Sequence, residues 1–414
     1  MAAYLSRLHH ISLHVSNVDK AAHELVSRFQ FNVFAARLTD RAKQLALRRG
    51  SAVFLVNERP SEAPRRLKEP QGLSCLYAAH AHYPVDTVSN VCFEVEDVQR
   101  ASAALRERGL CEFLQPPAEV SDDSGRVTFS IIRSPVGNVC HTLIDRSRYQ
   151  GPFLPGFHQV RTDSETAGRS QCPITHFDHI TYACPRSSTA LIARWYRDCF
   201  GFRRFFIDRN EDVDEGYVLN HNGIGLRLTA MEYWKCSESG ITLPFKDEQE
   251  PDCKFVIAES LPQQGRNQVD TFLDQHRGAG IQHIGLYTED IVRTARTLSL
   301  SGVQFFSPPP AYYTEVGKQD EIVAAGHDPH ALSRYGILLD TDLHTDTDSQ
   351  RYLLQVFTKP IFGEDTFFLE LIERRGATGF GEGNIRALWR SVQAYMENAE
   401  RHETERENKQ STPS

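Results

Sequence analysis

The sequence lacks the features that mark a membrane-spanning or nucleic-acid-binding chain. No apolar run among its 414 residues approaches the roughly 18 residues needed to cross a bilayer. The basic excess that neutralises phosphates is also missing, because 54 acidic residues outnumber 46 basic ones and the formal net charge is −8. We therefore expect no membrane span and no nucleic-acid partner, and a small molecule as the ligand.

Cysteine pairs at metal-binding or redox spacing are missing as well. The nine cysteines are scattered, and none forms a C-x-x-C motif. Several, including Cys92 and Cys140, lie inside apolar strand-like runs. We expect reduced thiols in a reducing compartment, with a cysteine nucleophile as the alternative. The N-terminus has no secretory signal and only a weak likeness to a transit peptide.

What is present is an internal repeat. With 40% hydrophobic and 24% charged residues, the chain suits a globular protein of two domains. One pattern of strand, polar turn, amphipathic helix and further strands begins four times, at Leu8, Val88, Phe177 and Ile281. Three of the helices, expected at 98–107, 191–199 and 291–300, run into a glycine that is expected as their C-cap, namely Gly109, Gly201 and Gly302. The first helix instead ends near Phe29. The repeat predicts an α+β protein with two domains, each a pair of βαβββ modules.

The repeat also sets the expected domain boundaries. Residues 1–150 form the first domain, and the Pro/Gly/Ser-rich stretch 151–172 reads as a linker. The second domain covers 173–384. Residues 385–414 should form a C-terminal helix, either a lid or a helix that only caps the domain, and then continue into a disordered tail. The buried face of that helix is predicted from the spacing of Ile385, Leu388, Trp389, Val392 and Met396.

Three residues of the second domain have the pattern of a metal site. His179 and His283 occupy the same position in the first strands of modules three and four, and Glu370 lies inside the apolar run 367–372. A glutamate in such a run is costly unless it is paired or coordinated. Two imidazoles and one carboxylate on one face are the ligand set of non-haem iron(II) oxygenases. This set leaves the remaining coordination positions of the iron open for substrate and O2. We predict that these residues bind Fe(II).

The first domain provides an internal control. His10 matches His179, but Asn90 stands where the second domain has His283, and Thr142 where it has Glu370. Because only one ligand in three is kept, we expect the first domain to bind no metal and to serve structure.

Four stretches carry a resemblance to a known family. They are 278–284 (GAGIQHI), 352–360 (YLLQVFTKP), 367–374 (FFLELIER) and 379–384 (GFGEGN). With these motifs the chain resembles 4-hydroxyphenylpyruvate dioxygenase and its relatives, of the vicinal oxygen chelate superfamily, over nearly its whole length. Residues 153–157 (FLPGF) and 325–330 (AGHDPH) look typical of the dioxygenase-like group within that family.

The resemblance implies an Fe(II) enzyme that uses O2 and an aromatic 2-oxo acid, with His179, His283 and Glu370 as ligands. Gln268, Gln282 and Gln355 match the family's pocket glutamines. The aromatic lining is matched by Phe357, Phe368 and Phe380. It further suggests a mitochondrial location, with a cytoplasmic one as the alternative, and a possible homodimer.

The departures from the family pattern affect the predicted pocket. Leu228 replaces a serine, Ala258 an asparagine and Ile385 a phenylalanine. An aliphatic residue at 385 resembles the hydroxymandelate synthases. We therefore predict conversion of 4-hydroxyphenylpyruvate to 4-hydroxymandelate, feeding a quinone head group such as that of coenzyme Q. Homogentisate formation and a catalytically silent scaffold are the alternatives.

Three other features are less specific. His327 and His330 could form a second metal site, but a solvated or lid-contacting loop is the favoured interpretation. The acidic set Asp340, Asp342, Asp346 and Asp348 lacks the glycine and closing glutamate of a calcium loop and is read as a hairpin loop. The basic run around residues 65–68 reads as a surface loop.

Overall fold

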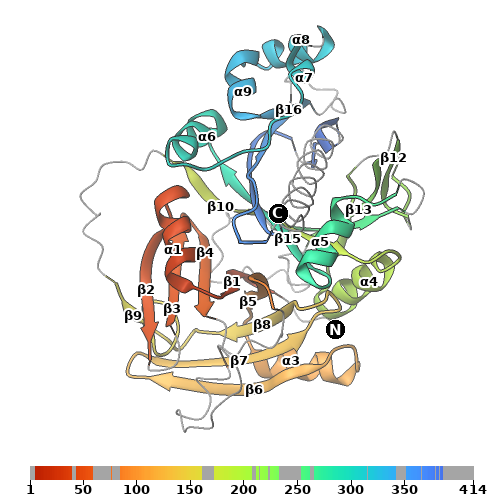
Figure 1. Cartoon of the computed structure of the whole chain (residues 1–414). Helices are drawn as coiled ribbons and strands as arrows, with labels where there is room; N and C mark the ends of the chain where they lie inside the picture. Colours follow the sequence, from red (N-terminus) through yellow and green to blue (C-terminus); the bar gives the residue numbers. More distant parts are fainter. Residues whose placement is uncertain are drawn as a thin grey trace, which may run out of the picture.

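The fold consists of two mixed β-sheets, one from each half of the chain, with helices packed on them (Figure 1). A computed structural model describes residues 5–39, 43–58, 76, 84–160, 172–207, 211–213, 215–221, 224–232, 253–261, 265–314, 316–341, 351–364, 366–377, 379–381 and 383–385. The predicted α+β class with two domains is confirmed. In the described residues no helix is long and apolar enough to cross a membrane.

The N-terminal sheet has the strand order β6-β7-β8-β5-β1-β4-β3-β2-β9. Its elements are β1 (Arg7–Val15), α1 (Val18–His23), η1 (Glu24–Arg28), β2 (Asn32–Leu38), β3 (Lys43–Arg49), β4 (Ala52–Glu58), β5 (Thr87–Glu94), α3 (Val98–Glu107), β6 (Phe113–Asp122), β7 (Gly125–Arg133), β8 (Cys140–Asp145) and β9 (His158–Gln159). The first strand of each module lies at the centre, so β1 and β5 pair antiparallel.

The C-terminal sheet repeats this plan with the order β11-β13-β14-β10-β15-β18-β17-β16, and β12 pairs with β13. Its elements are β10 (Ile174–Cys184), α4 (Thr189–Phe200), β11 (Arg203–Phe205), β12 (Tyr217–His221), β13 (Ile224–Glu232), β14 (Lys254–Ser260), α5 (Gln268–His276), β15 (Gly280–Thr288), α6 (Ile291–Leu300), α7 (Ala311–Thr314), α8 (Val316–Ala324), α9 (Pro329–Tyr335), β16 (Leu338–Thr341), β17 (Tyr352–Phe357) and β18 (Phe368–Arg375).

Capping residues set where the helices begin and end. Asp97 and Asp290 accept a hydrogen bond from the third helical amide of α3 and α6, which are the helices predicted at 98–107 and 291–300. Gly201 ends α4 with a φ of +71°, as its predicted C-cap role requires. A carboxylate on the last strand of each C-terminal module also reaches a helix start. Glu259 accepts from the Thr189 amide, and Glu373 from the Ile291 amide.

One hydrophobic core cluster spans both halves, because the sheets pack against each other through aromatic side chains. The rings of Phe54 and Phe177 have centroids 5.1 Å apart, and those of Phe93 and Phe255 are 6.2 Å apart. Glycine is needed where backbones meet. A Cβ on Gly137, whose φ is +44°, would lie 2.0 Å from the Ala279 carbonyl oxygen of the other half. The two halves therefore share an interior.

The segment predicted as a linker is only partly described. Residues 151–160 pack on the N-terminal sheet, where Phe153, Leu154 and Phe157 are buried and β9 pairs with β2. The N-terminal unit thus extends to residue 160, because these apolar side chains cover the sheet's face. Residues 161–171, the basic run at 65–68, Asp342, Asp346, Asp348 and the part of the predicted C-terminal helix beyond Ile385 lie outside the described residues.

Candidate metal centre

Three adjacent strands bring the predicted ligands together. His179 lies on β10, His283 on β15 and Glu370 on β18, and these strands are neighbours in the sheet. The register puts Gly285 opposite both His179 and Glu370, and Thr181 opposite His283. Since paired residues project to the same face, all three side chains meet on one side of the sheet. All are buried, with exposed fractions of 2%, 8% and 1%.

The three side chains converge on one carboxylate oxygen. Nε2 of His179 lies 3.0 Å from Oε2 of Glu370, and Nε2 of His283 lies 3.6 Å from the same oxygen. The ligand atoms are all within 4.8 Å of one another. Two imidazole nitrogens and one carboxylate oxygen facing one point have the composition and arrangement that a facial Fe(II) site requires.

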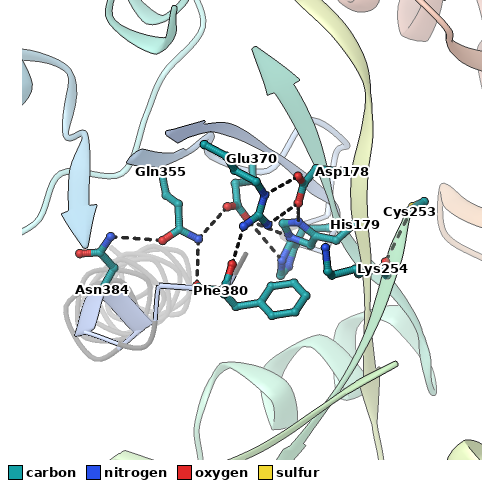
Figure 2. A network of polar contacts seen from close by, with 11 residues as sticks. Asp178, His179, Cys253, Lys254, Gln355, Glu370, Phe380 and Asn384 are labelled. Atoms are coloured by element: carbon teal, nitrogen blue, oxygen red, sulfur yellow. Dashed lines mark hydrogen bonds and ion pairs between the residues drawn. The ribbon is translucent and has the colours of Figure 1, made fainter. Parts of the chain in front are cut away.

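A buried ion pair fixes the orientation of His179. Its Nδ1 lies 2.9 Å from Oδ1 of Asp178, and both oxygens of Asp178 accept from the Arg374 guanidinium at 2.7 and 2.8 Å (Figure 2). Arg374 in turn donates to the Gly379 carbonyl. When Nδ1 carries the proton donated to Asp178, the lone pair of Nε2 is directed at the shared point.

The second carboxylate oxygen of Glu370 is held separately. Nε2 of Gln355 donates to Oε1 of Glu370 at 3.0 Å and to the Phe380 carbonyl at 3.2 Å (Figure 2). The Asn384 amide contacts Gln355 and, at 2.7 Å, the hydroxyl of Tyr312. Gln355 therefore connects the ligand strand to the 380–385 segment and leaves Oε2 directed toward the histidines.

Charge balance makes the two histidines different. Burial alone would lower the pKa of His179, but the Glu370 carboxylate and the Asp178 hydrogen bond outweigh it and raise that pKa to about 9. Burial and the nearby His179 lower the pKa of His283 well below its ordinary value. Burial would also raise the pKa of Asp178, yet Arg374 holds it well below its usual range.

Gly285 provides the space that the His179 ring occupies. A Cβ at this position would lie 2.4 Å from Cε1 and Nδ1 of His179. Any larger residue would displace the imidazole, so the glycine is a condition for the ligand geometry.

Aromatic rings cover both histidines. Phe368 stacks on His283 with centroids 4.8 Å apart, and Phe357 meets the same ring at 6.3 Å. Phe380 approaches His179 edge-on at 5.6 Å. All three phenylalanines are buried, so the triad has apolar surroundings on two sides.

The residues that depart from the family pattern lie together on one of these sides. Leu228 and Ala258 are directly opposite each other on β13 and β14. Both belong to one apolar cluster with Phe380 and Ile385. Gln268 opens α5, whose next residues Val269 and Phe272 join that cluster. The structure therefore places the three departures on the His179–Phe380 side of the triad.

Gln282 precedes His283 on β15 and is buried. Its amide oxygen, like Nδ1 of His283, has no hydrogen-bond partner among the residues described. Both atoms are free to bind a polar ligand group or a water molecule.

Several supporting residues escaped the sequence-based prediction. Asp178, Arg374 and Gly285 hold or accommodate His179, but none was predicted. A signal existed for Asp178, because an acid inside a buried strand needs a partner just as Glu370 does. The partner itself, Arg374, is a non-local contact that spacing does not reveal.

The remaining candidate sites are less organised. His330 is exposed and His327 half-buried, and together they provide no third ligand in the described part of the chain. Asp340 accepts a hydrogen bond from the Gly383 amide at 3.0 Å, which serves the 383–385 turn. The other described group of potential ligands is His9, His10 and Cys92 in the N-terminal half.

Comparison with known proteins agrees with this architecture. Residues 176–320 match the family model of the Glyoxalase/Bleomycin resistance protein/Dioxygenase superfamily. The rat and human 4-hydroxyphenylpyruvate dioxygenase-like proteins are each 43% identical over 397 residues, covering 95% of this chain and 98% of theirs. The chain belongs to the 4-hydroxyphenylpyruvate dioxygenase-like family.

More distant relatives of the family extend the likeness. A 4-hydroxyphenylpyruvate dioxygenase of Coccidioides posadasii is 28% identical over 400 residues, covering 93% of this chain and 91% of that one. An engineered variant of 4-hydroxymandelate synthase from Streptomyces coelicolor has a TM-score of 0.69 at 23% identity, covering 95% and 99% of the two chains. The latter shows that the fold is shared.

Proposed function

We propose that this chain is an Fe(II)-dependent dioxygenase that converts 4-hydroxyphenylpyruvate and O2 to 4-hydroxymandelate and CO2. The observation that carries the proposal is the convergence of His179, His283 and Glu370 on one point in an apolar setting. Bound iron would supply the redox chemistry, with the 2-oxo acid and O2 at the positions that the triad leaves open.

The chain's own residues position and protect this chemistry. Asp178 keeps the proton of His179 on Nδ1, and Gln355 keeps Oε1 of Glu370 occupied, so these two ligands each present one fixed atom. Phe368 and Phe380 exclude water from either side of the imidazoles. These are positioning roles, because none of the four needs to bond to the metal.

The choice of product follows from the apolar wall. Leu228, Ala258 and Ile385 offer no hydrogen bond to a phenol hydroxyl and no ring to clamp the substrate's ring. A ring held loosely can retreat, which leaves the benzylic carbon nearest the oxidising centre. A displacement of about 1 Å is enough to redirect a reaction. This favours hydroxylation of the side chain over attack on the ring.

Product analysis tests this proposal. The protein would be loaded with Fe(II) without oxygen, given 4-hydroxyphenylpyruvate and O2, and the products separated by chromatography. We expect 4-hydroxymandelate from the native chain, and a shift toward homogentisate in Ile385→Phe. Homogentisate from the native chain would support the proposed dioxygenase class but contradict 4-hydroxymandelate as the product. Absence of O2 uptake with every aromatic 2-oxo acid would favour the scaffold.

The cellular part of the proposal is separate. We propose a mitochondrial location, a contribution of 4-hydroxymandelate to a quinone head group such as that of coenzyme Q, and a homodimer. Fractionation of cells, isotope tracing from ring-labelled tyrosine into quinone, and sedimentation of the purified protein test these three points in turn. Label absent from quinone would exclude the pathway without affecting the reaction.

A further inference from the structure

Two thiols from different halves of the chain lie at the interface between the end of α3 and α4. Cys111 follows α3 in the N-terminal half, and Cys199 lies in the last turn of α4 in the C-terminal half. Each side chain shifts the pKa of the other, and hydrogen bonds between neighbouring residues join their two segments. Two cysteines whose Cα atoms lie about 4.4–6.8 Å apart can form a disulfide.

Hydrogen bonds on both sides hold the two segments together. Nη1 of Arg108 donates to the Asp198 carbonyl at 2.9 Å, so the residues just before each cysteine are joined. Nε1 of Trp195 donates to the Leu110 carbonyl, also at 2.9 Å. The contact between Cys111 and Cys199 is therefore part of a fixed interface between α3 and α4.

The two cysteines differ in exposure and in pKa, which suits Cys111 to react first with an oxidant and Cys199 to react second. Cys111 is half-buried, whereas the other cysteines in the described part of the chain are buried. The hydrogen bond from Cys199 lowers the pKa of Cys111 even though burial opposes this, and contact with Cys111 together with burial raises the pKa of Cys199. An accessible thiol with a lowered pKa reacts first with oxidants, and a buried neighbour can then resolve the product.

We propose that Cys111 and Cys199 form an interdomain disulfide when the protein meets a peroxide. The Cys111 thiolate attacks one peroxide oxygen, and the other oxygen leaves as water once protonated, which gives a sulfenic acid. The Cys199 sulfur then attacks the Cys111 sulfur, and the sulfenic oxygen leaves as a second water. In sum, two thiols lose two protons and two electrons, and one peroxide takes them up and is reduced to two waters.

The disulfide would fasten α4 to the N-terminal half. α4 lies between β10, which carries His179, and the outer strands of the C-terminal sheet. The closed loop runs from β6 through β10 to α4, so the bond would constrain a large part of the unfolded chain. The expected result is a cross-linked and more heat-resistant protein with its triad unchanged.

The experiment uses the whole reduced chain, freed of reductant without oxygen and treated with hydrogen peroxide in about equimolar to tenfold amounts. Remaining thiols are alkylated under denaturing conditions, and the digested protein is analysed by mass spectrometry. We expect a Cys111–Cys199 peptide pair two hydrogens lighter than its parts, faster migration on a non-reducing gel, and reversal by dithiothreitol. The melting temperature should rise by roughly 5 °C on oxidation.

Three variants sharpen the result. In Cys199→Ser, Cys111 should accumulate as a sulfenic acid that dimedone traps, whereas in Cys111→Ser the Cys199 thiol should stay reduced. Cys140→Ser is the matched control. Its hydroxyl can replace the donor that Cys140 offers to the Ser89 carbonyl, and the cross-link should form as in the native chain. Over-oxidation of Cys111 with Cys199 still alkylated, or a cross-link between other cysteines, would overturn the proposal.

Discussion

In the N-terminal sheet β1 and β5 pair through His10 and Cys92, and in the C-terminal sheet β10 and β15 pair through His179 and Gly285 at the same place. The parallel strand that follows agrees as well, because Cys92 faces Thr142 as Gly285 faces Glu370. The backbone that delivers three ligands in one half is thus also present in the other.

The side chains at these positions explain why only one half has a candidate iron site. In the N-terminal half Asn90 donates to the Thr142 hydroxyl at 2.8 Å, so the two positions bind each other. His10 bonds to His9 through their Nδ1 atoms, and burial lowers the pKa of both rings well below the ordinary value. The carboxylate nearest to His9 is Glu94, at 3.7 Å, and both of its oxygens already accept hydrogen bonds from Arg7.

One supporting arginine has been kept in both halves. Arg146 donates to the Gly151 carbonyl at 3.3 Å, as Arg374 donates to that of Gly379. Its other contact differs, because Arg146 lies 3.4 Å from His9, whereas Arg374 pairs with Asp178. The candidate metal site in the C-terminal half thus differs from the shared backbone by two acids: Glu370, which would bind the metal, and Asp178, which orients His179.

The largest effect is expected from removing the binding acid. In Glu370→Ala, the iron content after reconstitution should fall from about one per chain to near zero, and product formation should drop by about 1,000-fold or more. Thr142→Ala, the same strand position in the N-terminal half, should change neither. Metal analysis and turnover of both variants give the answer, and retained iron in Glu370→Ala would exclude the triad.

Binding of Fe(II) should slow backbone amide hydrogen exchange in the C-terminal half and leave it unchanged in the N-terminal half. At an Fe(II) concentration of about 100 times Kd, backbone amides of β10, β15 and β18 that exchange through opening of the site should slow by about 100-fold. Amides of β1, β5 and β8 should be unchanged. Mass-spectrometric exchange with and without Fe(II) measures this, and equal protection of both sheets would contradict the assignment of one metal-binding half.

The orienting acid is expected to have the next largest effect. Asp178→Asn leaves the buried Arg374 guanidinium without its countercharge, which costs about 3–5 kcal/mol of stability. Iron affinity should fall by about 10–100-fold, because the tautomer of His179 is no longer fixed. His9→Asn is the matched change in the other half and should leave iron affinity unaltered. A chelator titration compares the two.

The smallest effect on iron affinity is expected at the position next to the His179 ring, where the C-terminal half has Gly285 and the N-terminal half has Cys92. Gly285→Cys introduces the residue that the N-terminal half has there, and its Cβ would lie 2.4 Å from the His179 ring. We expect iron affinity to fall by about tenfold in a folded protein. The reverse change, Cys92→Gly, should affect stability alone. Unchanged affinity in Gly285→Cys would mean that the imidazole can rearrange at no cost.

How much the sequence could predict depends on how local the signal was. The four modules begin within three residues of the predicted starts, and the helices at 98–107 and 291–300 have the predicted bounds, whereas the helix expected at 191–199 is longer (Thr189–Phe200). Hydrophobic periodicity and C-terminal glycines are short-range patterns that the sequence shows directly. His179, His283 and Glu370 could be aligned because strands alternate and the repeat sets a common register. The structure brings these three residues together as the prediction expected.

The contacts between segments could not be predicted in this way. The pairing of Asp178 with Arg374 joins residues 196 positions apart, and Gly285 matters only because the His179 ring of another strand crosses it. The π-helical continuation of α1 into η1 was also missed, since the periodicity showed one helix ending near Phe29. Such features depend on packing between elements, which spacing does not encode.

The shared interior has a consequence for the history of the chain. Phe93 packs on Phe200 and Phe255, and the imidazole of His141 lies 2.8 Å from the hydroxyl of Tyr196, which in turn contacts that of Tyr182. Each half therefore completes the core of the other. The half without the triad could not be lost from such a chain, because its deletion would leave these aromatic side chains facing water. Packing alone is therefore a sufficient reason to retain it.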